Sequence, residues 1–196
     1  MSDPEQAELF SDLDALDLTR SLLRDLHDDL PQRMARFRYI ADISASMAPG
    51  GTMIFGGLAS STAYLEARSS FVNGNFIATI LLCQSLIENL LATFLHAASE
   101  TLPDKIQFNE TLRRCRAKGL LNEEDSGSLE RLIALRNPLM HFRDVNDSSN
   151  LMRRSIDSKL ATEDLLERDA FFAIGIGIKI LSKRPFRVGT LAGIGS

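Results

Sequence analysis

The chain has 196 residues, of which 44% are apolar and 24% are charged, and its formal net charge is −4. This length and composition fit a single globular domain that buries its own core. The negative net charge argues against a protein coated in positive charge for indiscriminate nucleic-acid binding, although it still allows a local basic cleft.

Cysteine usage and the ends of the chain bear on its location. Cys83 and Cys115 lie in helical contexts, and we expect both to be reduced thiols in a cytoplasmic protein. Residues 1–5 are polar and acidic, unlike a signal peptide. The longest apolar run near the C-terminus, residues 170–181, is too short to cross a bilayer, which needs about 20 residues. We therefore expect no membrane contact.

The N-terminal part of the chain combines leucines with aspartates. The leucine spacing predicts an acidic helix over residues 5–30, which we expect Pro31 to end. A second short helix is expected over residues 32–47, before a Pro-Gly-Gly break at 49–51. The acidic helix is either a solvated helix docked on the bundle or an interaction arm that covers a basic surface. Residues 1–57 thus form a predicted arm with a glycine-rich connector.

The strongest helical pattern covers residues 75–100, where apolar residues recur at steps of three and four. Gln84 and Glu88 interrupt this apolar stripe. Because burying an unpaired carboxylate is costly, we expect Glu88 to have a cationic or hydrogen-bonding partner. Further helices are expected over residues 58–72, 103–118, 122–136 and 162–183.

The remaining segments complete the predicted fold class. Residues 144–161 are polar and are predicted to form a long loop. No stretch shows the period-two alternation of a half-buried strand. We therefore predict an all-α fold with a bundle of four or five helices over residues 58–185, additional N-terminal helices, and a loose tail over residues 186–196.

The helix expected over residues 103–118 carries the densest group of basic residues, including Arg113 and Arg114. Positive charge near a helix C-terminus is favourable in itself, because it complements the helix dipole. Contact with RNA or phosphate is the alternative explanation for these arginines.

A polar motif lies inside the apolar run of residues 134–143, where Arg136, Asn137 and His141 occur close together. Pro138 lacks a backbone donor and disfavours helical geometry at Asn137, so we expect a kink or a new helix start just after Arg136. From there Asn137 and His141, four residues apart, share a face. The kink would bring Arg136 to the same surface.

The motif from Arg136 to His141 resembles the signature of the HEPN superfamily, all-helical domains found in many prokaryotic toxins, abortive-infection proteins and CRISPR ribonucleases. The helix at 75–100, with Glu88 inside it, is similar to the family's earlier core helix. The resemblance covers residues 60–183 and implies a HEPN-like antiparallel bundle.

A second arginine and histidine pair has a related spacing. Arg20 and His27 lie in the acidic leucine helix, but no asparagine follows this arginine. The neighbouring aspartates would oppose phosphate binding, so we do not interpret this pair as a site.

The resemblance implies a metal-independent endoribonuclease, such as a toxin or a phage-defence effector, with no cofactor and no metal. Histidine titrates near neutral pH, so His141 is the candidate acid or base, and Arg136 offers a permanent charge for the phosphorane. Asn137 would orient the histidine or the phosphate, and Glu88 would hold Arg136 or fix the histidine tautomer. Expected substrate contacts are Arg143, Arg113 and Arg114.

The expected partners follow from the same resemblance. They are RNA, a second copy of the chain whose motif faces the same cleft, and an antitoxin or regulatory partner. The alternative function is a non-catalytic HEPN-like helical module that dimerises or binds a protein or nucleotide.

Overall fold

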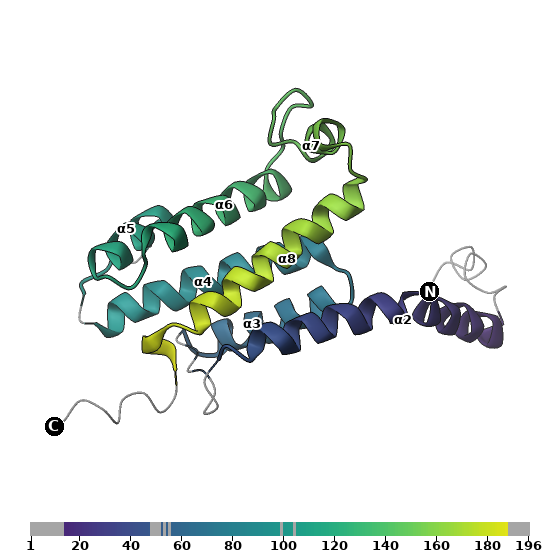
Figure 1. The fold of residues 1–196 in the computed structure, drawn as a ribbon, viewed down its shortest axis with the longest axis horizontal. Helices are drawn as coiled ribbons and strands as arrows, with labels where there is room; N and C mark the ends of the chain where they lie inside the picture. Colours follow the sequence, from purple (N-terminus) through teal and green to yellow (C-terminus); the bar gives the residue numbers. More distant parts are fainter. Residues whose placement is uncertain are drawn as a thin grey trace, which may run out of the picture.

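The computed structural model describes residues 14–47, 52, 54, 56–98, 100–103 and 105–187. These residues form helices joined by loops, with one isolated β-bridge between Thr52 and Arg187 and no strand. The predicted all-α class is therefore confirmed for the described part of the chain. The helices are α2 (Ala15–Ser44), α3 (Gly57–Val72), α4 (Phe76–Ala97), α5 (Phe108–Ala117), α6 (Glu123–Met140), α7 (Leu151–Ser158), α8 (Thr162–Leu181) and the short 3-10 helix η1 (Arg184–Phe186) (Figure 1).

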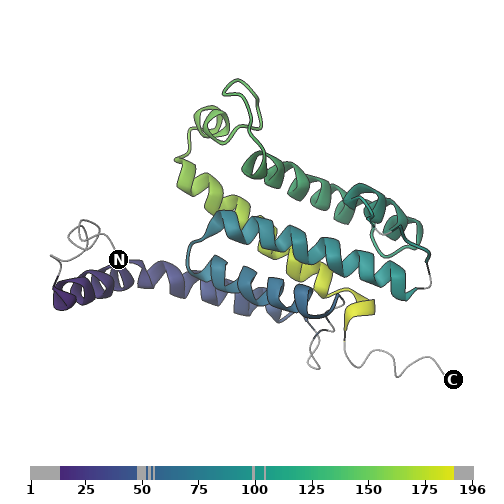
Figure 2. The same ribbon diagram turned by 180° about the vertical axis from the view of Figure 1, so that it is seen from behind.

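Helix α4 lies at the centre of the bundle and contacts α3, α5, α6 and α8 (Figures 1 and 2). Its fully buried residues include Ile80, Ile87 and Leu91, which belong to one continuous core. By length and composition, α4 is the described helix that is apolar enough to cross a membrane, a test that the core helix of a soluble protein also passes. Helix α4 is therefore the shared partner of α3, α5, α6 and α8, while α2 packs on α3 and α8.

Helix α8 packs closely on α4 where Gly177 faces Cys83. A Cβ atom at Gly177 would lie 3.9 Å from the sulfur of Cys83, an ordinary van der Waals distance. Both cysteines are buried, and this desolvation raises the pKa of the Cys83 and Cys115 thiols to about 12. The two thiols therefore fill space in the core as small apolar groups.

Buried charge joins α6 to α8. The fully buried Asp125 is contacted by Lys183, which donates a hydrogen bond, and by Lys179, whose Nζ lies 3.3 Å from the carboxylate. Burial raises the pKa of Asp125, but the lysines and the backbone N–H of Asn122 outweigh that effect and hold it below its ordinary value. The ion pairs of Asp125 with Lys179 and Lys183 hold the N-terminal end of α6 against α8.

The expectation that Pro31 ends a helix was wrong, because α2 is a single helix from Ala15 to Ser44 that contains this proline. Pro31 is exposed, so the carbonyl group that loses its helical hydrogen bond can be solvated. Ion pairs also cross the proline, since Asp29 before it accepts hydrogen bonds from Arg33 and Arg36 after it. The separate short helix expected over residues 32–47 is the second half of α2.

Two other boundaries also differ from expectation. Helix α5 begins at Phe108 rather than near residue 103, because the backbone at Gln107 is still extended. Helix α7 lies inside the segment that was expected to be a loop. Its first turn is capped by the side chain of Asn150, which accepts hydrogen bonds from the next backbone N–H groups. Helix α7 is only eight residues long and buries none of them, and its apolar residues Leu151, Met152 and Ile156 follow directly on a polar run, so it was missed.

The packed region extends further toward the C-terminus than expected. Phe186, placed in the predicted tail, is fully buried, and its ring meets that of Phe94 at a centroid distance of 5.8 Å. Three expected features lie outside the described residues: the start of the first helix from residue 5, the break at 49–51 and the tail beyond residue 187.

Candidate functional site

One cleft of about 540 Å³ brings together four residues of the predicted site, namely Glu88, Arg136, Asn137 and His141. Three parts of the chain line it: α4, residues 105–109 before and at the start of α5, and the C-terminal end of α6. These segments are distant in sequence and meet only because α5 and α6 both pack on α4.

The C-terminal end of α6 determines where the motif lies. At the other end of this helix, Asn122 and Asp125 form a capping box, each side chain accepting a hydrogen bond from the other's backbone N–H group. The helix then continues through Pro138 to Met140, so the new helix start expected after Arg136 is absent.

His141 lies just beyond the helix rather than on its face. Its backbone is extended, with φ −130° and ψ 139°, while its N–H group donates a 3.0 Å hydrogen bond to the carbonyl oxygen of Asn137. The residue is exposed at the mouth of the cleft, whereas Arg136 and Asn137 are half-buried. The histidine therefore meets the other two because the helix ends there, and not because of helical spacing.

Arg136 carries a charge that no carboxylate of the described residues neutralises. Among the described residues its side chain makes one hydrogen bond, in which Nη1 donates to Oδ1 of Asn137 at 3.3 Å. The ion pair expected between Glu88 and this arginine is absent, since the Glu88 carboxylate makes no ion pair and no hydrogen bond with any described residue. A guanidinium with free N–H groups on the wall of a cleft is suited to binding an anion.

Gln84 is the most deeply buried polar group in the cleft. Its side chain is 6% exposed, and its Oε1 atom has no hydrogen-bond partner among the described residues. A buried amide without a partner costs free energy in the empty cleft, and a bound polar ligand would recover it. Gln84 had appeared in the sequence only as an interruption of the apolar stripe. Its position one turn before Glu88 was the signal that placed it on the same face.

The loop before α5 adds a second cation. Lys105 lines the cleft and makes no ion pair among the described residues. Sequence reasoning missed it, because a lysine in a polar loop has no periodicity to place it. Together with Arg136 it gives the cleft two unpaired cations against one carboxylate, Glu88.

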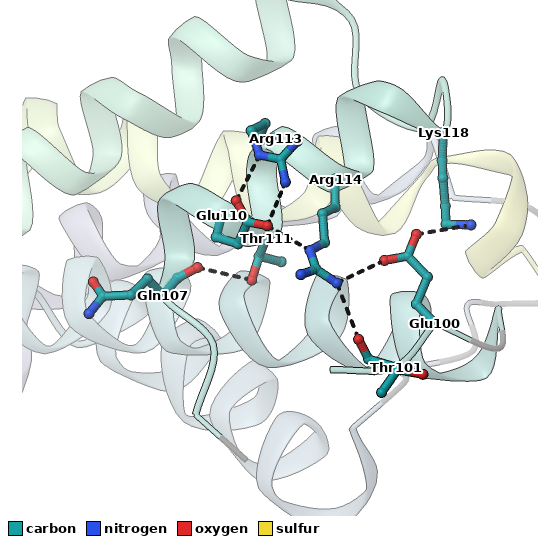
Figure 3. Close-up of polar contacts among 8 residues, drawn as sticks. All are labelled: Glu100, Thr101, Gln107, Glu110, Thr111, Arg113, Arg114 and Lys118. Atoms are coloured by element: carbon teal, nitrogen blue, oxygen red, sulfur yellow. Dashed lines mark hydrogen bonds and ion pairs between the residues drawn. The ribbon is translucent and has the colours of Figure 1, made fainter. Parts of the chain in front are cut away.

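The arginines of α5 lie outside this cleft and already have partners (Figure 3). Arg113 and Arg114 both donate to the carboxylate of Glu110, at 2.6–2.7 Å, and Arg114 also reaches Glu100 at 3.4 Å. Hydrogen bonds from these arginines lower the pKa of Glu110 to about 2. The patch therefore has a structural explanation, and its expected contact with RNA stays a prediction.

Arg143 follows His141 closely in sequence but does not line the cleft. Its Nε atom lies 3.9 Å from the carboxylate of Asp147, and its carbonyl oxygen accepts a hydrogen bond from the side chain of Asn150. This residue fixes the loop between α6 and α7. The described residues also contain no group of three or more His, Cys, Asp or Glu side chains placed to hold a metal ion.

Comparisons of the chain with protein-family models, with curated proteins and with solved structures found no match. The interpretation of the cleft therefore depends on its own geometry and chemistry.

Proposed function

We propose that the chain is a metal-independent endoribonuclease whose active site is the cleft around Arg136 and His141. The observation that carries the proposal is the meeting of an exposed imidazole with an unneutralised guanidinium in one cleft of about 540 Å³. The resemblance of this motif to the HEPN signature supports the same assignment.

The proposed chemistry needs a proton acceptor, a proton donor and a cation. A neutral His141 removes the proton from a ribose 2′-hydroxyl, whose oxygen then attacks the adjacent phosphorus. The bond from phosphorus to the 5′-oxygen breaks, and that oxygen takes a proton from an imidazolium, supplied by His141 of a second copy in the arrangement that the resemblance implies. The products are a 2′,3′-cyclic phosphate and a 5′-hydroxyl.

The other lining residues have complementary roles in this proposal. Arg136 stabilises the negative charge that develops on the non-bridging oxygens, and Asn137 orients its guanidinium through their hydrogen bond. Lys105 on the opposite segment attracts the RNA backbone. Gln84 supplies an amide to a polar group of the bound nucleotide, which pairs the atom left without a partner in the empty cleft.

The decisive experiment incubates the purified full-length chain with single-stranded RNA in EDTA and identifies the products by mass spectrometry. His141→Ala should lower the cleavage rate by about 10²–10⁴-fold, the usual contribution of general acid–base catalysis. The matched control is His96→Ala, because His96 is exposed on α4 and does not line the cleft. It should cleave as fast as the wild type.

Two results would contradict the proposal. One is RNA that stays intact at high wild-type concentration, and the other is an unchanged rate in His141→Ala, which would indicate a contaminating nuclease. Intact RNA that still binds, with an affinity that Arg136→Ala weakens, would instead support the non-catalytic binding module.

A further inference from the structure

The cleft holds two hydrogen-bond acceptors to which no described residue donates. One is Oε1 of Gln84, a residue that is only 6% exposed, and the other is the half-buried carboxylate of Glu88. The two residues are four apart on α4, so they occupy one face on successive turns. A buried acceptor without a donor costs free energy, so a ligand that donates to both groups would gain affinity from them.

The carboxylate of Glu88 is unexpected in a cleft that is proposed to bind RNA. Its charge repels the phosphate backbone, which Arg136 and Lys105 attract. Glu88 therefore opposes binding unless it contacts a part of the nucleotide that offers donors. The ribose 2′-hydroxyl is a single donor, and in the proposed mechanism its proton goes to His141. The other donors of RNA are the N–H groups of the bases, whose edges proteins read in single-stranded segments.

Guanine is the base whose donors match this pair of acceptors. Its Watson–Crick edge presents N1–H and the N2 amino group side by side, so a carboxylate accepts two parallel hydrogen bonds, and the second hydrogen on N2 remains for another acceptor. Adenine and cytosine each have one amino group beside a ring nitrogen that is an acceptor, and uracil has one N–H between two carbonyl oxygens. In those three bases an acceptor would face the carboxylate of Glu88.

The apolar part of the cleft suits the flat faces of a base. Ile106 and Phe108, before and at the start of α5, line the cleft together with Ile133 of α6. Its volume of about 540 Å³ lies in the range of small-molecule sites, in which apolar walls surround a few polar groups that fix the ligand. A base can therefore bury its ring faces here while its edge reaches α4.

We propose that Gln84 and Glu88 recognise guanine, so that the chain cleaves RNA beside guanosine. Glu88 accepts hydrogen bonds from N1–H and N2–H of the base, and Oε1 of Gln84 accepts the second hydrogen on N2. The inference rests on the proposed function, because it takes the ligand of the cleft to be RNA. The two residues determine specificity, while the proton transfers belong to His141.

The first test measures binding without cleavage. One ligand is a short single strand of deoxyuridine with a single deoxyguanosine, and the other has deoxyinosine in its place, which lacks the N2 amino group. Neither strand can be cleaved, because neither has a 2′-hydroxyl. The full-length protein should bind the guanine strand at least about tenfold more tightly, since hypoxanthine leaves Gln84 and one oxygen of Glu88 unpaired. Fluorescence anisotropy measures both affinities.

Substitutions then test whether the preference comes from this pair. Glu88→Gln keeps the size of the side chain but places an amide N–H₂ against the donors of the base, so most of the preference for guanine over hypoxanthine should be lost. Gln84→Leu removes the amide and should retain part of the preference, because the Glu88 contacts remain. The matched control is Glu130→Gln, the same change at an exposed residue of α6 outside the cleft, and it should keep the wild-type preference. Circular dichroism checks that each variant is folded.

Ribonucleotide versions of the two strands separate this inference from the proposed function. Cleavage at least about tenfold faster beside guanosine than beside inosine would support both. Equal binding and equal cleavage of the two strands would overturn guanine recognition and leave the endoribonuclease function standing. Guanine-selective binding without cleavage, lost in Glu88→Gln, would overturn that function and retain guanine recognition.

Two further outcomes count against the inference. A preference for guanine that persists in Glu88→Gln would overturn its assignment to this pair of residues. A wild type that neither binds the deoxyribonucleotide strands nor cleaves the RNA would overturn the inference and the proposed function together.

Discussion

Helix α4 and the first half of α2, residues 15–30, which we call the arm, both carry leucines at helical spacing, yet their environments are opposite. In α4, Leu90, Leu91 and Leu95 are fully buried because four other helices surround them. In the arm, Leu16 and Leu23 remain 52% and 59% exposed. The comparison teaches that periodicity determines which residues share a face, while the neighbouring elements determine whether that face is covered.

The largest difference between the two regions should appear in stability. Leu91→Ala removes a fully buried side chain and should lower the free energy of unfolding by about 2–5 kcal/mol. Leu23→Ala should change it by less than about 0.5 kcal/mol in the monomer, because the side chain is already largely in water. Urea unfolding at low protein concentration measures both. A similar loss for the two variants would show that the arm packs within a single copy.

A smaller contrast is expected between buried and exposed carboxylates. Asp125→Ala removes the buried partner of Lys179 and Lys183 and half of a capping box, so it should cost about 2–4 kcal/mol. This loss is smaller than the loss expected for a fully buried ion pair, because the side chains of both lysines reach solvent. Asp28→Ala in the arm should cost less than about 0.5 kcal/mol. Thermal unfolding followed by circular dichroism measures both changes. Equal melting temperatures for Asp125→Ala and Asp28→Ala would contradict the expected difference.

The smallest expected effect is on how the stability of the fold changes with pH. Arg113 and Arg114 lower the pKa of Glu110 from 4.5 to about 2, so the ionised carboxylate stabilises the fold above pH 4.5. This contribution is lost as the pH falls from 4.5 toward 2, where the carboxylate takes up a proton. Glu110→Gln should therefore show a shallower loss of stability over this interval than the wild type. Urea midpoints at several pH values test this, and an identical pH dependence in Glu110→Gln and the wild type would contradict it.

The sequence predicted the fold class and most helices, because apolar periodicity and caps act locally. Asn122 is an example, since its side chain accepts the hydrogen bond expected of an N-cap. The failures at Pro31 and α7 have different causes. The exposed Pro31 is accommodated inside α2 because ion pairs join the residues on its two sides, whereas α7 is a helix of only eight residues that follows a polar run.

The candidate site was predictable only in part. Arg136, Asn137 and His141 were found because they are close in sequence, and they do line one cleft. Lys105 comes from a distant loop, and only the packing of α5 on α4 places it there. The sequence also could not show that Glu88 and Arg136 form no ion pair, because the distance between these two side chains depends on how α6 lies against α4.

The burial of Phe186 has a practical consequence for shortened forms of the protein. Its ring fills the space beside Phe94 at the end of α4. A chain cut before this phenylalanine would open a void there and expose Phe94 to water, so such products should aggregate or be degraded on expression. Cutting after Arg187 would retain the ring and its contact with Phe94, which makes that position a better choice for deletions and fusions than one before Phe186.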